Sequence, residues 1–436
     1  MRVLKFGGTS VGSAQRMVEV ANLINDGVPK IVVLSAMSGT TNNLVEISAH
    51  LYKKDLKGAA DIINRLEQKY QTEVEALYST PQFKAKGKEL IKNHFDFLKS
   101  FTIDMFTVYE EKAILAQGEL LSTAMFQYYL EEQGRNSMLI PALEYMRTDK
   151  HNEPDMAYIQ DSLAKTLAPY SHINTFITQG YICRNSFGEI DNLQRGGSDY
   201  SASLIGAAIG ADEIQIWTDI DGMHNNDPRF VEHTKSVSDL SFDEAAELAY
   251  FGAKILHPTC VLPAKDKNIP VRLLNTYEPQ AHGTLISSKQ IKNRIAAVAA
   301  KDGITAIKIK SSRMLMAYGF MRKVFEIFES YKTPIDMITT SEVGVSITID
   351  HDRNLAEIVE DLKKFGTVEV DTNQVIISVV GDLVASTKGN AGKIFEALKE
   401  VPIRMISYGG SNYNVSLVIS AEDKKTALNA LSQHIF

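Results

Sequence analysis

Residues 5–11 read Lys-Phe-Gly-Gly-Thr-Ser-Val, and this stretch decides the fold class of the chain. It begins at the end of a strand-like run over residues 3–6 and precedes a helical pattern over residues 14–26, which Ser13 can cap and Gly27 can end. The glycines would let backbone N–H groups approach an anion, and Lys5 would add a positive charge beside a phosphoryl oxygen. A plain tight turn explains the double glycine about equally well, and the spacing fits neither a Walker A loop nor G-x-G-x-x-G.

From residue 1 to about residue 287, short β-branched runs alternate with longer amphipathic segments. This alternation predicts parallel strands joined by crossover helices, and therefore an α/β fold. The expected strands are residues 31–34, 137–140, 175–178, 214–218 and 271–274. Residues 55–110 are mostly helical in pattern and predict a helical insertion beside the sheet. Ser241 and Glu244 have the spacing of a capping box at the start of a further helix.

The composition is that of an ordinary globular protein. The chain has 436 residues, a length that predicts two or three domains. Its net charge of −7 argues against a nucleic-acid partner. Its longest uncharged stretch, residues 200–211, is far shorter than the roughly 20 apolar residues of a membrane span. The two cysteines, Cys183 and Cys260, are too few for a disulfide framework. With no signal peptide in the first residues, we expect a cytoplasmic protein without a membrane partner.

The last third of the chain contains an internal repeat with an offset of 70 residues. Four residues of the first copy recur in the second: Gly319, Lys323, Phe325 and Glu326 match Gly389, Lys393, Phe395 and Glu396. Each copy is predicted to run strand, helix, two strands, helix, strand, the ferredoxin-like order. We expect a first domain at 1–290 and the two copies at 300–370 and 371–436. Such paired domains bind a small ligand at their joint or serve only to dimerise.

Two further motifs carry charged residues beside predicted helices or strands. Residues 195–199, Arg-Gly-Gly-Ser-Asp, precede an apolar helical segment and would bind a second anion, for which the planar fork of Arg195 suits a carboxylate. Alternatively, Arg195 only pairs with Asp199 at the surface. Asp219 and Asp221 follow the strand predicted at 214–218 and are compatible with an acid–base pair, metal ligands or a simple turn. His257 is expected to be a packed histidine.

Taken together, five motifs resemble those of the aspartate kinases, in the same order and over nearly the whole chain. They are KFGGTSV at 5–11, QGELLST at 117–123, RGGSDY at 195–200, residues 217–221 with 227–229, and GAKILHP at 252–258. The resemblance implies a three-layer α/β/α amino-acid-kinase sandwich with a mostly parallel sheet, followed by two ferredoxin-like ACT domains. It also implies transfer of the γ-phosphoryl group of ATP to the β-carboxylate of L-aspartate. The product is 4-phospho-L-aspartate, in the first step of lysine, threonine, methionine and isoleucine biosynthesis.

The resemblance implies a role for each matching residue. Around ATP it implies Lys5, Gly7, Gly8, Thr218, Asp219, His224, Arg229, Lys254 and Ile255, although many relatives carry tyrosine where this chain has His224. Around aspartate it implies Thr41, Glu119, Arg195 and Ser198, with Ser35 close by. Lys5 and Asp199 form the catalytic pair, in which Asp199 orients Lys5 or the substrate ammonium and is not a base. Mg²⁺ is expected with ATP, and no protein ligand is assigned to it because this ion usually keeps several waters.

Residues 311–314, 319–321 and 335–342 resemble the first ACT unit of lysine-inhibited aspartate kinases. The resemblance implies feedback inhibition by lysine, with threonine as the second choice, and a homodimer through the ACT domains, with further pairing into a tetramer left open. The implied effector contacts are Met314, Gly319, Phe320, Met321, Ile335, Asp336, Thr340, Ser341 and Glu342. Met314, Phe320 and Met321 are alternatively ordinary core residues.

Two other functions compete with this interpretation. A kinase of the same fold could act on glutamate, carbamate or a nucleoside monophosphate, or an inactive kinase domain could serve as an amino acid sensor. Lys5, Arg195, Asp199 and Lys254 are all present, which argues against the loss of chemistry. Because the sequence stops at residue 436, we expect a monofunctional enzyme without a homoserine dehydrogenase domain.

Overall fold

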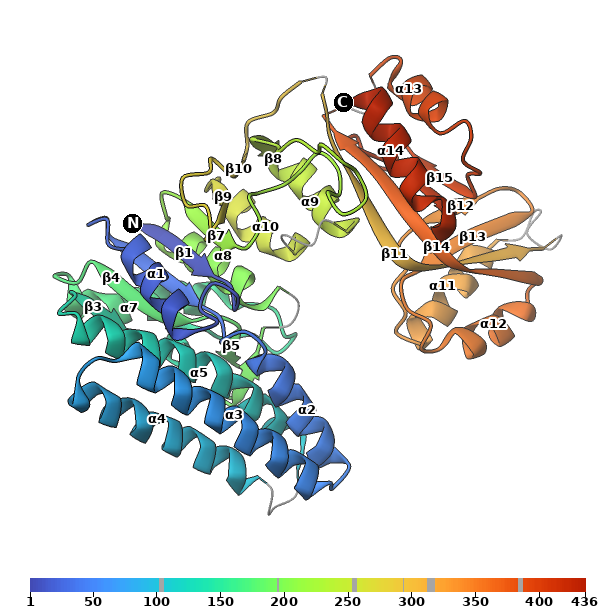
Figure 1. Ribbon diagram of the computed structural model, residues 1–436. Helices are drawn as coiled ribbons and strands as arrows, with labels where there is room; N and C mark the ends of the chain where they lie inside the picture. Colours follow the sequence, from blue (N-terminus) through green and yellow to red (C-terminus); the bar gives the residue numbers. More distant parts are fainter. Residues whose placement is uncertain (102–105, 194–195, 253–256, 293, 312–317, 383–386) are drawn as a thin grey trace. The chain divides into compact units, whose positions relative to one another are not determined.

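The structure is a computed structural model that describes residues 1–101, 106–193, 196–252, 257–292, 294–311, 318–382 and 387–436 (Figure 1). The chain forms two compact units. The first unit contains Met1–Met223 and Ile255–Ser288, and the second contains His224–Lys254 and Lys289–Phe436. A segment that follows the strand predicted at 214–218 therefore belongs to the second unit and not to the first.

The first unit is built around a mostly parallel sheet. Its strands are β1 (Arg2–Phe6), β2 (Lys30–Leu34), β3 (Ser137–Leu139), β4 (Thr175–Gln179), β7 (Ile214–Thr218), β9 (Val271–Asn275) and β10 (Thr284–Ser287). They lie in the order β3-β4-β2-β1-β7-β9-β10, and every pair from β3 to β9 is parallel, whereas β10 runs antiparallel to β9. The five strands expected from the sequence are confirmed. A separate hairpin joins β5 (Ile182–Arg184) to β6 (Ile190–Asn192).

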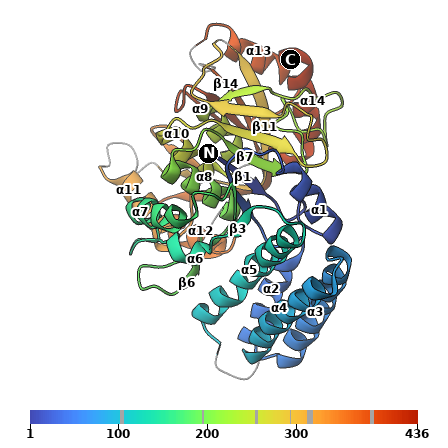
Figure 2. The same cartoon turned by 90° about the vertical axis from the view of Figure 1, so that its left-hand side faces the viewer.

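Helices surround this sheet. They are α1 (Ala14–Leu23), α2 (Thr40–Tyr52), α3 (Leu56–Leu77), α4 (Pro81–Ser100), α5 (Val108–Glu132), α6 (Ala142–Tyr145), α7 (Met156–Leu167), α8 (Gly197–Ile209) and α10 (Pro258–Asp266). The side chain of Ser13 caps α1, as predicted, by accepting a hydrogen bond from Arg16 N. The predicted helical insertion is also confirmed, because α3 and α4 pack beside α2 and α5 (Figures 1 and 2).

Strand alternation divides the side chains of β1 between the two faces of the sheet. Leu4 and Phe6 belong to one core cluster with residues of α1, α2, α3, α4 and α5. Lys5 points to the opposite face, where α8 covers β1. The expected three-layer α/β/α sandwich is therefore present, and an ionisable side chain lies inside its α8 layer.

The second unit contains an antiparallel sheet with helices. Its sheet strands are β11 (Ile295–Lys310), β12 (Ile338–Thr340), β13 (Gly344–Ile349), β14 (Thr367–Gly381), β15 (Met405–Tyr408) and β16 (Asn414–Ser420), in the order β12-β13-β11-β14-β16-β15. Its helices are α9 (Phe242–Tyr250), α11 (Phe320–Ser330), α12 (Leu355–Lys363), α13 (Asn390–Ala397) and α14 (Lys424–Ile435), and the short strand β8 (Asp239–Ser241) precedes α9. The capping box predicted for Ser241 and Glu244 is confirmed at the start of α9.

The 70-residue repeat is visible in matching helix starts. Gly319 precedes α11 and Gly389 precedes α13, and both glycines have left-handed φ angles, 81° and 88°. At these positions a residue with a side chain would be strained. The two copies of the repeat also have separate cores, one centred on Ile347 and the other on Ile377.

The second copy differs from the expected order of elements. Its sequence ends with α14, so residues 371–436 do not contain a last strand. That strand is the first half of β11, which pairs with the second half of β14 through registers such as Lys301 opposite Ile376. The second half of β11 and the first half of β14 belong to the first copy. Strands of 16 and 15 residues are long enough to run through both copies, with a register shift between Lys301 and Ile304.

No helix in the described ranges is both long and apolar enough to cross a membrane.

Candidate active site

The candidate active site lies at one edge of the first-unit sheet. Because β1, β2, β4 and β7 are parallel neighbours, their carboxyl ends meet at this edge. The residues that follow these ends are Gly7 after β1, Ser35 after β2, Gly180 after β4 and Asp219 after β7. In open α/β sheets, ligands bind outside the carboxyl ends of the strands.

Lys5 is the buried cation of this edge. Its side chain leaves the α8 face of β1, and its Nζ lies 2.6 Å from Asp199 Oδ1 in the first turn of α8. Lys5 is only 8% exposed, so an unpaired ammonium at this position would be costly. Asp199 therefore fixes the Lys5 ammonium close to the first glycine turn, where a Cβ on Gly7 would lie 3.5 Å from Nζ.

The first glycine turn is tight because the next loop presses against it. A Cβ on Gly8 would lie 2.9 Å from the carbonyl oxygen of Ala36, which is closer than real Cβ contacts. The N–H of Gly7 donates to the carbonyl oxygen of Trp217 at 3.3 Å, so this amide joins the loop to β7. Glycine at position 8 is thus required by the approach of the loop after β2, whatever the turn binds.

The second glycine turn begins α8. Gly196 has a left-handed φ of 82° and occupies the N-cap, and Gly197 opens the helix. The hydroxyl of Ser198 accepts a hydrogen bond from Ser35 Oγ at 2.9 Å, which joins the start of α8 to the carboxyl end of β2. Arg195, the expected carboxylate ligand of this turn, lies outside the described residues.

Glu119 is the most unusual ionisable group at this edge. It lies in the middle of α5, is only 3% exposed, and its Oε1 accepts a hydrogen bond from the N–H of Ala36 at 3.2 Å. Its Oε2 is buried without a hydrogen-bond partner among the described residues. Burial raises the pKa of Glu119 to about 8, since a carboxylate without a cation is poorly solvated there.

A series of contacts links Lys5 to Glu119. Asp199 pairs with Lys5, its neighbour Ser198 bonds to Ser35, and the amide of Ala36 bonds to Glu119. The edge thus offers a cation for an anionic ligand and an unsatisfied carboxylate for a cationic one. Thr41 lies half-buried in the first turn of α2, shortly after these loop residues.

Thr218 and Asp219 extend the edge at the end of β7. The carbonyl oxygen of Thr218 accepts hydrogen bonds from both N and Oγ1 of Thr276, at 2.8 and 3.0 Å. Thr276 in turn bonds to Ser10 of the first glycine turn at 2.7 Å. Asp219 is exposed. The ends of the neighbouring strands β1 and β7 and the loops that follow them therefore hold Lys5, Gly7, Gly8, Thr218 and Asp219.

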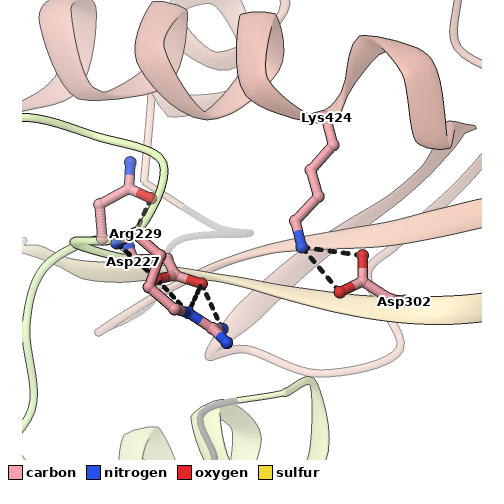
Figure 3. A network of polar contacts seen from close by, with 5 residues as sticks. Asp227, Arg229, Asp302 and Lys424 are labelled. Carbon is pink, nitrogen blue, oxygen red and sulfur yellow. Dashed lines mark hydrogen bonds and ion pairs between the residues drawn. The ribbon is translucent and has the colours of Figure 1, made fainter.

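No further expected nucleotide residue lies in the described part of the first unit. His224 and Arg229 belong to the second unit, where His224 Nδ1 lies 2.7 Å from Thr234 Oγ1. Arg229 is mostly exposed and pairs with Asp227 at 2.6 Å, near the Lys424–Asp302 pair (Figure 3). Lys254 and Ile255 lie outside the described residues.

Sequence reasoning missed Tyr181. This residue has a left-handed φ of 68°, which is uncommon for a side chain of its size, and its N–H donates to Ser201 Oγ at 2.9 Å. A Cβ on Gly197 would lie 3.0 Å from its ring, so Tyr181 packs against the second glycine turn. Burial raises the pKa of its hydroxyl to about 12. A signal for it exists in the sequence, because Tyr181 closely follows a predicted parallel strand, as the first glycine turn does.

The expected effector residues lie in the first copy of the repeat. Asp336 is the buried acid among them: its side chain is 3% exposed and its Oδ1 lies 2.6 Å from Lys301 Nζ. Burial raises the pKa of Asp336, although the ion pair with Lys301 opposes the shift. Phe320 packs in the core against Phe365, in line with the alternative that it is a core residue.

The remaining effector residues differ in exposure. Gly319, Thr340, Ser341 and Glu342 are exposed, whereas Met321 and Ile335 are partly buried against the core. Met314 lies outside the described residues.

Comparison with known proteins relates both units to one group of enzymes. The model of the amino acid kinase family matches residues 1–275, and an ACT domain model matches residues 377–435. Aspartokinase 2, chloroplastic, of Arabidopsis thaliana is 34% identical, with 100% of this chain and 84% of that protein covered. The crystal structure of E. coli aspartokinase III with aspartate and ADP, in the R-state, has a TM-score of 0.87, 31% identity and full coverage of both chains. Its T-state complex with lysine and aspartate has a TM-score of 0.83 and 31% identity, and covers 100% of this chain and 99% of that one.

The raised pKa of Glu119 predicts a pH-dependent stability of the first unit. The folded protein keeps a proton on Glu119 that the unfolded chain releases above its ordinary pKa of 4.5, so this group's contribution to the free energy of unfolding falls as the pH rises from about 5 to 8. Glu119→Gln is therefore expected to be more stable than the wild type by several kcal/mol at pH 9 and about equally stable at pH 5. Denaturant unfolding, followed by the fluorescence of the single tryptophan Trp217, measures the difference.

Glu46→Gln is the control, because Glu46 is exposed on α2. A constant difference between Glu119→Gln and wild type from pH 5 to pH 9 would contradict the assigned protonation of Glu119.

Proposed function

This chain belongs to the aspartokinases, within the amino acid kinase family, and we propose that the edge holding Lys5, Asp199 and Glu119 is its active site. The enzyme transfers the γ-phosphoryl group of ATP to the β-carboxylate of L-aspartate, giving 4-phospho-L-aspartate. The observation that carries the site assignment is the buried Glu119, whose second oxygen has no partner among the described residues at an edge that also holds a buried lysine.

In this proposal Glu119 accepts the ammonium group of aspartate. A cation is the ligand that a buried, unsatisfied carboxylate requires, and its arrival would release the proton that burial keeps on Glu119. Ser35, Ser198 and Thr41 supply hydroxyls beside it. Arg195 would hold a substrate carboxylate through its planar fork.

Lys5 stabilises the charge of the transferring phosphoryl group. The β-carboxylate of aspartate is already ionised at pH 7, so the reaction requires no strong general base. The main difficulty is to bring two anions together. At about 4 Å and an effective dielectric near 20, one positive charge contributes roughly 4 kcal/mol before desolvation. Asp199 acts on the reaction by orienting Lys5, with which it forms a 2.6 Å ion pair.

The nucleotide lies against the glycine turn in this proposal. Gly7 lets phosphates come close to Lys5, because a Cβ at this position would lie 3.5 Å from Lys5 Nζ, and Gly8 would contact them through its backbone. Thr218 and Asp219 border the same edge, and His224, Arg229, Lys254 and Ile255 complete the proposed nucleotide contacts. Mg²⁺ accompanies ATP and supplies further charge neutralisation. We expect this ion to be held mainly by phosphates and water, because Mg²⁺ usually keeps several waters.

The site assignment predicts a large loss of turnover in Lys5→Met. Without its charge, the transition state loses a stabilising interaction, and kcat is expected to fall at least about a hundredfold. Asp199→Asn, which keeps the lysine but loosens its position, is expected to reduce kcat less, on the order of tenfold. The measurement is hydroxamate formation from ATP, Mg²⁺ and L-aspartate in the presence of hydroxylamine.

Lys57→Met is the matched control, because Lys57 is exposed on α3. Near-normal turnover in Lys5→Met would refute the assigned role of Lys5. Absence of product from the wild-type chain would instead favour an amino acid sensor.

We further propose that lysine is the feedback inhibitor and that it binds to the first copy of the repeat. Support comes from the buried acid Asp336, whose Oδ2 has no partner among the described residues and suits an ammonium group. In this proposal the head group of the effector lies near Gly319, Phe320 and Met321 at the start of α11. Ile335, Thr340, Ser341, Glu342 and Met314 complete the proposed contacts, and threonine is the second choice of effector.

Lysine binding is expected to weaken at least about tenfold in Asp336→Asn, since a neutral amide does not balance the effector's charge. Calorimetric titration of the full chain with lysine measures this, and inhibition of hydroxamate formation gives an independent value. Asp352→Asn, an exposed position of the same unit, is the control. Unchanged affinity in Asp336→Asn would remove Asp336 from the effector site.

We also propose a homodimer through the second unit, which could pair further into a tetramer. Large apolar side chains are exposed on this unit, among them Tyr318, Phe325, Val343 and Ile406. A solution mass of about twice the 48.3 kDa of one chain is expected from light scattering at micromolar concentration. A monomer mass at every concentration would contradict this proposal.

A cytosolic location is part of the proposal as well. Its support is that Cys183 and Cys260 are both buried and free, as in proteins of reducing compartments.

A further inference from the structure

Lys301 occupies a junction within the second unit. It lies where β11 passes from the second copy of the repeat to the first, at the register shift before Ile304. The next residue, Asp302, forms an ion pair with Lys424 of α14 at 2.7 Å (Figure 3), so the two neighbours make ion pairs with different copies. Lys301 itself was not among the residues expected to bind a ligand.

The Lys301 ammonium lies between two carboxylates of the first copy. Its Nζ is 2.6 Å from Asp336 Oδ1 and 3.0 Å from Asp350 Oδ2, and its side chain is 19% exposed. Tyr250 of α9 borders the cluster, with its ring centre 5.1 Å from Nζ. Backbone hydrogen bonding of Asp336 to Thr348 holds the acid against β13.

The cluster of Lys301, Asp336 and Asp350 has one negative charge in excess when its groups are ionised. Lys301 satisfies one oxygen of Asp336, while Oδ2 of the same side chain, which is 3% exposed, has no partner in the described part of the chain. A buried carboxylate oxygen without a donor can accept a hydrogen bond from a bound ligand. The excess negative charge of the cluster favours a cationic ligand there.

We propose that Lys301 is a specificity-determining residue of the effector site, because its ammonium neutralises one of the two aspartates and limits the cluster to one added cation. This inference rests on the proposed role of Asp336. A dibasic amino acid meets a single excess negative charge there, and its affinity is weakened by the nearby Lys301 ammonium. Lys301 thereby sets the effector concentration at which the site fills, and the preference for a cationic over a neutral side chain.

The test is a charge series measured with L-lysine on the full-length protein. Lys301→Gln makes the cluster charge −2, the wild type has −1, and Asp350→Asn gives 0. The dissociation constant for lysine, from calorimetry at pH 8, is expected to fall in Lys301→Gln and to rise in Asp350→Asn, each on the order of fivefold. The affinity for L-norleucine, which has no side-chain ammonium, is expected to change much less.

Two controls separate charge from damage to the fold. Lys301→Arg keeps the charge and is expected to bind lysine as the wild type does. Lys310→Gln removes an exposed lysine of the same strand, paired with Glu369 at 2.8 Å, and is expected to have no effect. General damage would weaken binding in both Lys301→Gln and Asp350→Asn, whereas the proposal requires opposite shifts.

Shifts in the same direction, or an unchanged affinity in Lys301→Gln, would overturn the inference. If Asp336→Asn loses lysine binding while the charge series is flat, only the inference about Lys301 fails. If Asp336→Asn binds lysine normally, the proposed effector site fails first. Comparison of the two results therefore identifies which statement is wrong.

Discussion

The constraint on which the first unit depends is that β1, β2, β4 and β7 are adjacent and parallel. Parallel neighbours bring their carboxyl ends to one edge, so loops that are far apart in the sequence must share a small space. Only glycine fits where these loops touch, as Gly8 does against Ala36. The period of two along β1 then directs Lys5 away from the apolar cluster of Leu4 and Phe6 and toward α8. The position and the charge of Lys5 at the proposed active site thus follow from strand geometry.

The charged groups in the interior of this enzyme differ in whether they have an ion-pair partner. The buried Lys5 and the partly buried Lys301 each have a carboxylate oxygen 2.6 Å from Nζ, which offsets the cost of removing their charge from water. Glu119 and the second oxygen of Asp336 do not have such a partner among the described residues. A buried carboxylate oxygen without a partner lowers the stability of the fold, but it raises the affinity of its site for a cation. We interpret both acids as groups whose missing partner is supplied by an amino acid.

The sequence predicted the elements of the first unit well, because alternation, caps and glycine turns are local signals. The strand at 214–218, the cap at Ser13 and the helical insertion are examples. Contacts between distant residues were beyond such reasoning. The sequence indicated Lys5 as one of two groups that Asp199 could orient. It did not indicate the Ser35–Ser198 hydrogen bond or the left-handed Tyr181, because both depend on how loops from separate strands pack. Lys301 was missed because nothing in its neighbours along the chain indicates two aspartates 35 and 49 residues away.

The shared strands β11 and β14 have a consequence for the ancestry of the regulatory unit. The second copy takes its last strand from chain that precedes the first copy, so in sequence it is a circular permutant of the domain that it duplicates. The first copy is then an insertion within the second, and its own ends lie on two neighbouring strands. No single cut in the gene would separate the two copies as two complete domains. Neither fragment from a cut at residue 371 would retain a complete second domain, which would keep such paired modules together during evolution.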